Sequence, residues 1–184
     1  AGGTGLLFGE LIKAGLMHGD AAVCFGGTLE TACIEPFIEE GSLRWRAAVA
    51  HSLDPEVIRS ADSAFHPEGG IRLLEGNLGR SLIKTSAVAP ERQSMTAPAV
   101  VISDQQELTA LFEQGELDRD CVVVVRFQGP AANGMPELHQ LMPILGVLQD
   151  RGYAIALVTD GRLSGASGKV PAAIHVTPEA AKGG

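Results

Sequence analysis

The stretch IALVTDGRLSGASGKVPAAIHVTPEA, residues 155–180, decides the fold class of this chain. Its opening apolar run, Ile155 to Val158, is typical of a buried strand and stops abruptly at a polar, glycine-spaced segment. Ligand crevices in α/β proteins form where buried strands end in such loops, because the loops bring backbone amides, hydroxyls and cations together. We therefore predict an α/β fold and expect this loop to bind an oxygen-rich anion.

A second buried strand precedes this stretch. Residues 121–127 (CVVVVRF) form a continuous apolar run, and the loop that follows opens a helix with Pro136 near its first position. If the two strands are neighbours, their loops emerge at one edge of the sheet, and Glu137 and Ser164 face a shared pocket. Glu137 is then either a carboxylate in a first helical turn, favoured by the helix dipole, or a ligand of a divalent metal such as Mg²⁺.

Several polar residues of the loop after Val158 are candidates for chemistry. Ser164 and Ser167 are either turn residues that satisfy local amides or members of a site. Arg162 and Lys169 are either solvated charges or cations that hold a phosphate or carboxylate. The loop lacks the glycine and the hydroxyl residue that a phosphate-binding P-loop requires, and Ser164 lacks the flanking glycines of a hydrolase nucleophile.

Asp160 and His175, in the same stretch of sequence, have simpler interpretations. Asp160 is expected to accept amide hydrogen bonds in the turn. His175 lies between Ile174 and Val176, and this apolar setting favours a core histidine over a ligand. A final helix is expected from Thr177 onward.

The sequence pattern in the rest of the second half predicts short strands and one helix. Glycines mark the turn between the first two strands, and Ser103 forms a capping box with Gln106 at the start of the helix, which ends at Gly115. The predicted strands cover residues 71–74, 81–88 and 99–102.

The first half has a mainly helical pattern. Apolar residues between 6 and 16 fall on one helical face, with Gly15 as the stop. Residues 33–50 continue a helical pattern that Pro36 and Gly41-Ser42 interrupt, and Trp45 is expected in the core.

A segment rich in proline and glycine, residues 51–70, reads as a linker. We place a domain boundary within it, which gives a mainly helical part, residues 1–65, and a β-rich domain, residues 66–184.

Composition limits the class of protein. The chain has 184 residues and a net charge of -8, which argues against a nucleic-acid-binding face. Cys24, Cys33 and Cys121 show no close spacing, so they predict buried, inert thiols in a reducing compartment instead of disulfides or a metal site. The apolar runs are too short to span a bilayer and no signal peptide opens the chain, so we expect a cytoplasmic protein without a membrane partner.

Three blocks of sequence carry a family resemblance: GNLGRSLIKTSAV (76–88), DRDCVVVVRFQGPAANGMPELHQLMP (118–143) and ALVTDGRLSGASGKVPAAIHVTPEA (156–180). They resemble the dihydroxy-acid dehydratase/6-phosphogluconate dehydratase family. The amino-acid-biosynthetic branch usually follows its Ser-Gly with a Gly-Thr-Arg-Gly type of sequence. This chain instead has Ala166-Ser167-Gly168-Lys169-Val170-Pro171 there, which favours the 6-phosphogluconate dehydratase branch.

The resemblance implies a specific domain organisation. Family members have a large N-terminal α/β domain and a barrel-like, swivelling β/β/α C-terminal domain. Residues 1–65 would be the end of the first domain, and residues 66–184 most of the second. Both termini read as cuts through a longer polypeptide, so we expect the chain to be a piece of one, truncated before the end of its C-terminal domain.

The resemblance also implies a reaction. Enzymes of this branch are hydro-lyases that convert 6-phospho-D-gluconate to 2-keto-3-deoxy-6-phosphogluconate in the Entner–Doudoroff pathway. They use an iron–sulfur cluster, expected to be 4Fe-4S with its ligands outside this chain, and a divalent metal such as Mg²⁺. By resemblance, Ser164 would remove the C2 proton as an alkoxide and Glu137 would bind the metal, while the cluster takes the C3 hydroxyl. Lys169, Arg162 and Lys84 are our own candidates for binding the substrate's phosphate or carboxylate.

Other interpretations stay open at this point. The chain is alternatively a related dehydratase for branched dihydroxy acids or unphosphorylated sugar acids, or a binding domain that keeps the fold without the chemistry. Because its cysteines match none of the family's cluster motifs, we expect the chain alone to be inactive. The family also implies a homodimer for the full-length protein.

Overall fold

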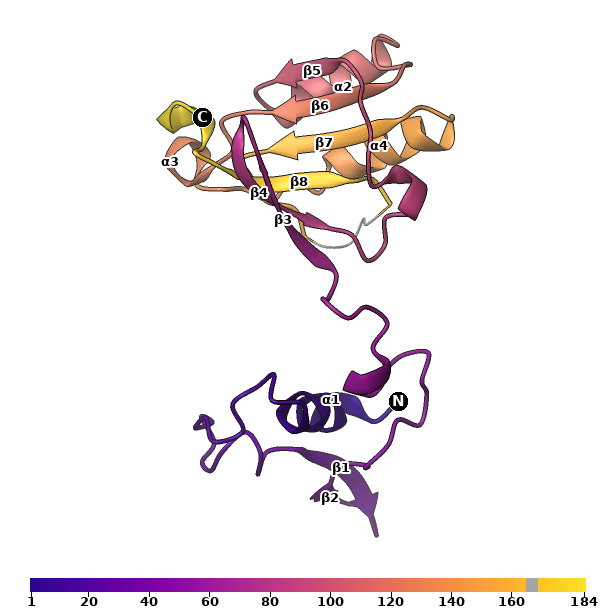
Figure 1. The fold of residues 1–184 in the computed structure, drawn as a ribbon, viewed down its shortest axis with the longest axis vertical. Coiled ribbons are helices and arrows are strands. Elements are labelled where there is room, and N and C mark those ends of the chain that lie inside the picture. Colours follow the sequence, from indigo (N-terminus) through magenta and orange to yellow (C-terminus); the bar gives the residue numbers. More distant parts are fainter. Residues whose placement is uncertain (165–168) are drawn as a thin grey trace. The chain divides into compact units, whose positions relative to one another are not determined.

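The computed structural model of the chain describes residues 1–164 and 169–184 (Figure 1). The chain divides into two compact units, Ala1–Pro67 and Glu68–Gly184. This division lies close to the boundary expected after residue 65. The assignment of the first unit to an N-terminal α/β domain stays a prediction.

The first unit contains one α-helix and one β-hairpin. Helix α1 (Gly3–Lys13) ends before Gly15, which adopts the left-handed φ of 71° that a helix stop requires. Strands β1 (Ile34–Glu39) and β2 (Ser42–Ala47) pair antiparallel, and a short 3₁₀ turn, η1 (Ala61–Ser63), follows.

The hairpin replaces the helical pattern expected over residues 33–50, so that prediction is wrong. Glu40 and Gly41 both have positive φ, 49° and 77°, which is the geometry of a tight hairpin turn. Pro36 lacks an amide donor and is tolerated because β1 is an edge strand of a two-stranded sheet. Trp45 is 59 % exposed within the chain, so its expected place in the core is also wrong.

The second unit is built on a six-stranded sheet with the order β3-β4-β8-β7-β6-β5 (Figure 1). The four strands β8, β7, β6 and β5 run parallel, and the β3–β4 hairpin joins β8 antiparallel. The strands are β3 (Ile71–Gly76), β4 (Gly79–Lys84), β5 (Ala99–Ile102), β6 (Cys121–Val125), β7 (Ile155–Thr159) and β8 (Ala172–Thr177). The helical elements are η2 (Pro90–Arg92), α2 (Gln105–Glu113), α3 (Pro130–Asn133), α4 (Leu141–Asp150) and η4 (Ala180–Lys182).

This mixed, mostly parallel sheet confirms the predicted α/β class, whereas the barrel-like description is not confirmed. Helix α2 begins one residue later than expected, because the Asp104 carboxylate accepts the amides of Gln106 and Glu107 and makes Asp104 the N-cap. Strand β8 was not expected, since its two alanines and its histidine give a weak strand pattern. The final helix expected from Thr177 is reduced to the 3₁₀ turn η4.

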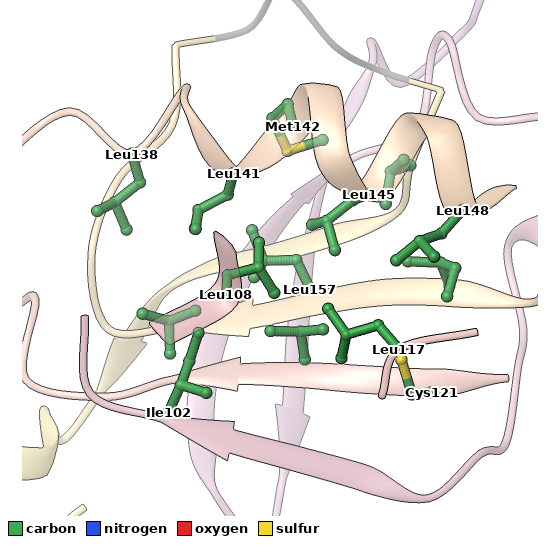
Figure 2. Packing of buried hydrophobic residues seen from close by; sticks show 14 residues of the cluster. Ile102, Leu108, Leu117, Cys121, Leu138, Leu141, Met142, Leu145, Leu148 and Leu157 are labelled. Atoms are coloured by element: carbon green, nitrogen blue, oxygen red, sulfur yellow. The ribbon is translucent and has the colours of Figure 1, made fainter. Parts of the chain in front are cut away.

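The core of the second unit lies between α4 and the parallel strands (Figure 2). Leu141, Leu145 and Leu148 recur at helical spacing on one side of α4 and are at most 1 % exposed. They face the buried side chains of β6 and β7, such as Leu157, and the pairing of Val123 with Leu157 keeps the two strands in register. Burying a leucine side chain stabilises a fold by about 1.5–3 kcal/mol, so this helix anchors the sheet.

Among the residues that the structure describes, no helix combines the length and the apolar character needed to cross a bilayer.

We predict that Leu145→Ala lowers the free energy of unfolding by about 2–5 kcal/mol, because it opens a cavity beneath α4. Urea denaturation followed by circular dichroism measures the change. Val147→Ala, on the exposed side of the same helix at 43 % exposure, is the matched control and should change stability by less than about 0.5 kcal/mol. Equal losses in the two variants would contradict this assignment of the core.

Candidate functional site

The candidate site begins at the carboxyl ends of β6 and β7. These strands are parallel neighbours, and Val125 at the end of β6 pairs with Thr159 at the end of β7. The loops that follow, residues 126–140 and 160–164, therefore leave the sheet at the same edge, as the sequence predicted. Crevices at this edge are the usual ligand sites of open α/β sheets.

Glu137 connects the two loops. Its Oε1 accepts the backbone amide of Ser164 at 2.8 Å, and its Oε2 lies 3.4 Å from Nη1 of Arg162. The Arg162 Nε donates to the carbonyl of Met135 at 3.0 Å, and the Leu138 amide donates to the Arg162 carbonyl at 3.3 Å. The structure thus brings together three of the residues that the sequence singled out: Glu137, Ser164 and Arg162.

The backbone around Glu137 is extended, and the residue forms a parallel bridge with Arg162. Helix α3 ends at Asn133 and α4 starts only at Leu141, so the interpretation of Glu137 as a carboxylate in a first helical turn is wrong. The amide of Ser164 lowers the pKa of Glu137 below its ordinary value, and Arg162 lowers it further against a partial opposing effect of burial. Glu137 is accordingly ionised at neutral pH.

A second carboxylate, Asp160, ties three segments of the chain together. It is 6 % exposed and sits directly after β7. Its Oδ1 accepts the amide of Gln128 at 2.8 Å, and its Oδ2 accepts the amide of Ala180 at 3.0 Å. The sequence predicted that Asp160 accepts amide hydrogen bonds, but these amides come from the loop after β6 and the segment after β8, not from its own turn.

Glu179, in the segment after β8, is a third carboxylate that accepts a backbone amide from another segment. Both carboxylate oxygens of Glu179 accept the amide of Ala131, at 3.1 and 3.0 Å. The carboxylate packs so closely on Gly129 that a side chain at this glycine would collide with it. Asp160, Glu179 and Glu137 together fix the loop after β6 at three points, all through charge-assisted hydrogen bonds to backbone amides.

Backbone strain concentrates in the same region. Phe127, Met135 and His175 have φ of 62°, 58° and 56°, a conformation that residues other than glycine adopt rarely and at a cost of about 1–3 kcal/mol. Phe127 and Met135 belong to the loop that carries Glu137, and the His175 amide donates to the Gly161 carbonyl at 2.9 Å in the other loop. Strain of this kind is typical of sites where function constrains the backbone.

The remaining candidates lie elsewhere. Lys169 forms an ion pair with Asp150 at the end of α4. Lys84 ends β4 opposite Ile71, and because β4 runs antiparallel to β8, it lies toward the end of the sheet where the parallel strands begin. The structure therefore does not bring these two lysines to Glu137. Ser167 and its neighbouring glycines lie outside the described residues.

Comparison with known proteins identifies the family. The family model described as "Dihydroxy-acid/6-phosphogluconate dehydratase C-terminal" matches residues 56–184. The chain belongs to this dehydratase family. It is 58 % identical to the phosphogluconate dehydratase of Pseudomonas aeruginosa and 59 % identical to that of Escherichia coli, in both cases over the whole chain and 30 % of the relative. A dihydroxy-acid dehydratase of Lachnospira eligens is 36 % identical over the whole chain and 31 % of the relative.

These matches confirm the resemblance that the three sequence blocks carried. The chain spans about 30 % of the length of the curated dehydratases it matches.

The dehydratase family implies an iron–sulfur cluster and a divalent metal, and the residues of this chain suit only the second. Cys24 is exposed, so the expectation of buried thiols is wrong for this residue. Cys33 is half-buried and Cys121 is buried, and burial raises the pKa of both thiols, which disfavours the thiolates that bind iron. In the described part of the chain, no group of three or more His, Cys, Asp or Glu side chains is placed to hold a metal ion. An iron–sulfur cluster therefore does not fit these residues, whereas the partly exposed carboxylate of Glu137 suits one ligand position of a divalent metal.

We predict that Asp160→Asn destabilises the second unit by about 1.5–3 kcal/mol, because an asparagine has one acceptor oxygen for the two amides that Asp160 binds. Urea denaturation measures the loss. Asp20→Asn changes an exposed aspartate and is the matched control. An unfolding midpoint that matches the control would show that Asp160 does not hold the loops.

Glu137→Gln should reveal a pH-dependent contribution to stability. The folded chain lowers the pKa of Glu137, so it favours the ionised carboxylate, and the resulting stabilisation is complete above the ordinary value of 4.5. It is lost as the pH falls through the lowered folded pKa. The variant should therefore be about 1 kcal/mol less stable than the native chain at pH 7 and approach it below pH 4.5.

Denaturation curves across this pH range, with exposed Glu116→Gln as the control, measure the difference. A difference for Glu137→Gln that is independent of pH would contradict the assignment.

Proposed function

We propose that this chain provides the base-bearing loop of a phosphogluconate dehydratase. The proposed reaction is the dehydration of 6-phospho-D-gluconate to 2-keto-3-deoxy-6-phosphogluconate and water. The contact that carries the proposal is the hydrogen bond from the Ser164 amide to Glu137, because it fixes the proposed base beside the proposed metal ligand. The identity to phosphogluconate dehydratases, 58–59 % against 36 % to a dihydroxy-acid dehydratase, supports the choice of substrate.

Ser164 is the proposed base that removes the C2 proton. The residue is exposed, its amide donates to Glu137, and its side chain also lowers the pKa of that carboxylate, so the hydroxyl lies beside the proposed metal ligand. A serine hydroxyl is a very weak acid, so it can act as an alkoxide only beside positive charge. A divalent metal bound by Glu137 would supply such charge at this position.

Arg162 is the proposed contact for an anionic group of the substrate. Its guanidinium is about half exposed, with 51 % of the side chain accessible, although Glu137 and the Met135 carbonyl hold its orientation. A guanidinium with donors left over can bind a carboxylate or a phosphate. Lys169 and Lys84 are weaker candidates, because Lys169 is paired with Asp150 and Lys84 lies toward the other end of the strands.

Departure of the C3 hydroxyl requires a Lewis acid. The described residues of this chain form no site for the iron–sulfur cluster that the family implies, so the proposed enzyme needs residues beyond those described for this step. We therefore expect the 184-residue chain by itself to be inactive. A cytoplasmic location and a homodimeric full-length protein also stay predictions.

Ser164→Ala in a full-length dehydratase whose matching segment is this sequence should lower kcat for 6-phosphogluconate by at least about a hundredfold, because the proposed proton acceptor is lost. Product formation, measured as the 2-keto acid, checks the change. Ser94→Ala, at an exposed serine outside the site, is the control and should retain activity.

The same enzyme should prefer 6-phosphogluconate to 2,3-dihydroxyisovalerate and to unphosphorylated gluconate. Preference for either of the other substrates would identify a related dehydratase. Full activity in the Ser164→Ala variant would exclude Ser164 as the base, and a lack of activity towards all three acids in the native sequence would favour a non-catalytic binding domain.

A further inference from the structure

Strand β8 contains an irregularity at His175. Its pairing with β4 shifts register between the pair Arg80–Thr177 and the pair Leu82–Ile174, so β8 has one residue more than β4 in this interval. His175 lies within the interval and has a φ of 56°. This combination is a β-bulge, in which the left-handed position is usually taken by glycine.

The bulge lies beside the candidate site. The amide of His175 points to the β7 side of β8 and donates to the Gly161 carbonyl at 2.9 Å, directly before Arg162. His175 is half-buried and lines a cavity of about 390 Å³ whose wall also includes Met135 and Asp160. The cavity therefore adjoins both loops that Glu137 connects.

The polar groups around this cavity differ in their availability to a ligand. The carboxylates of Asp160 and Glu179 also line it, but both are bound to backbone amides, as described above. Within residues 1–164 and 169–184, the imidazole of His175 makes no hydrogen bond. It is therefore a half-buried donor and acceptor at the wall of a cavity.

A purely structural role does not explain a histidine at this position. Glycine adopts the left-handed conformation without strain, and asparagine tolerates it better than most residues. The strained backbone and the unpartnered imidazole therefore both indicate that the side chain itself is required.

We propose that His175 contacts the substrate, by a hydrogen bond from its imidazole to an oxygen of the sugar acid bound in this cavity. The inference rests on the proposed function, because it takes the ligand to be the oxygen-rich substrate of the Ser164 loop. His175 is then a substrate-contacting residue on β8, whereas Glu137 and Ser164 lie in the loops that follow β6 and β7.

The test replaces His175 with residues that suit the bulge. In the full-length dehydratase that carries this sequence, His175→Asn and His175→Gly should lower kcat/KM for 6-phosphogluconate by about tenfold to a hundredfold, the usual range for a lost hydrogen bond to a charged or polar ligand. Their unfolding temperatures should equal or exceed that of the native enzyme, because backbone strain is relieved. Added imidazole should restore part of the activity of His175→Gly.

The outcomes separate this inference from the proposed function. His66→Asn, at an exposed histidine outside the second unit, is the control and should leave both readouts unchanged. Lower unfolding temperatures together with lower activity would make His175 a residue of the fold and overturn the inference. Unchanged activity in the His175 variants, with activity lost in Ser164→Ala, would overturn this inference alone. Retained activity in Ser164→Ala would instead overturn the proposed function.

Discussion

The parallel pairing of β6 with β7 is the constraint on which the candidate site depends. Because Val125 pairs with Thr159, the loops after both strands begin side by side, although they are more than thirty residues apart in sequence. Helix α4 packs its leucines on these strands and keeps them in place (Figure 2). The core therefore fixes the positions of the strand ends, and polar contacts then hold the loops that carry the site.

Those polar contacts follow one rule, in which a carboxylate from one segment accepts backbone amides from another. Asp160 and Glu179 hold the loop after β6 by the amides of Gln128 and Ala131, and Glu137 holds the Ser164 amide in return. Each contact satisfies an amide that the sheet does not use, so these contacts order the segments between the strands. A site built this way can tolerate the positive φ of Met135, because the contacts on either side of this residue fix its backbone.

The sequence predicted most of the sheet because β5, β6 and β7 are apolar and bounded by clear breaks. It could not predict β8, whose residues are only half-buried, or the β1–β2 hairpin, whose apolar residues also fit a helical spacing. The meeting of Glu137 with Ser164 followed from strand order alone. The amides that Asp160 accepts and the ion pair of Lys169 depend on tertiary contacts that local sequence does not encode. The apolar neighbours of His175 predict a core residue, because a β-bulge leaves no signature in a single sequence.

The position of β8 in the sheet has a consequence for how the second unit forms. The β3–β4 hairpin is encoded first and can close locally, but its partner in the sheet is the last of the six strands along the chain (Figure 1). β8 pairs with both β4 and β7. During synthesis the hairpin and the β5–β6–β7 group therefore cannot join into one sheet until Ala172–Thr177 has emerged. Closure of the sheet is thus a late, long-range event, and it is the same event that places the bulge beside the Ser164 loop.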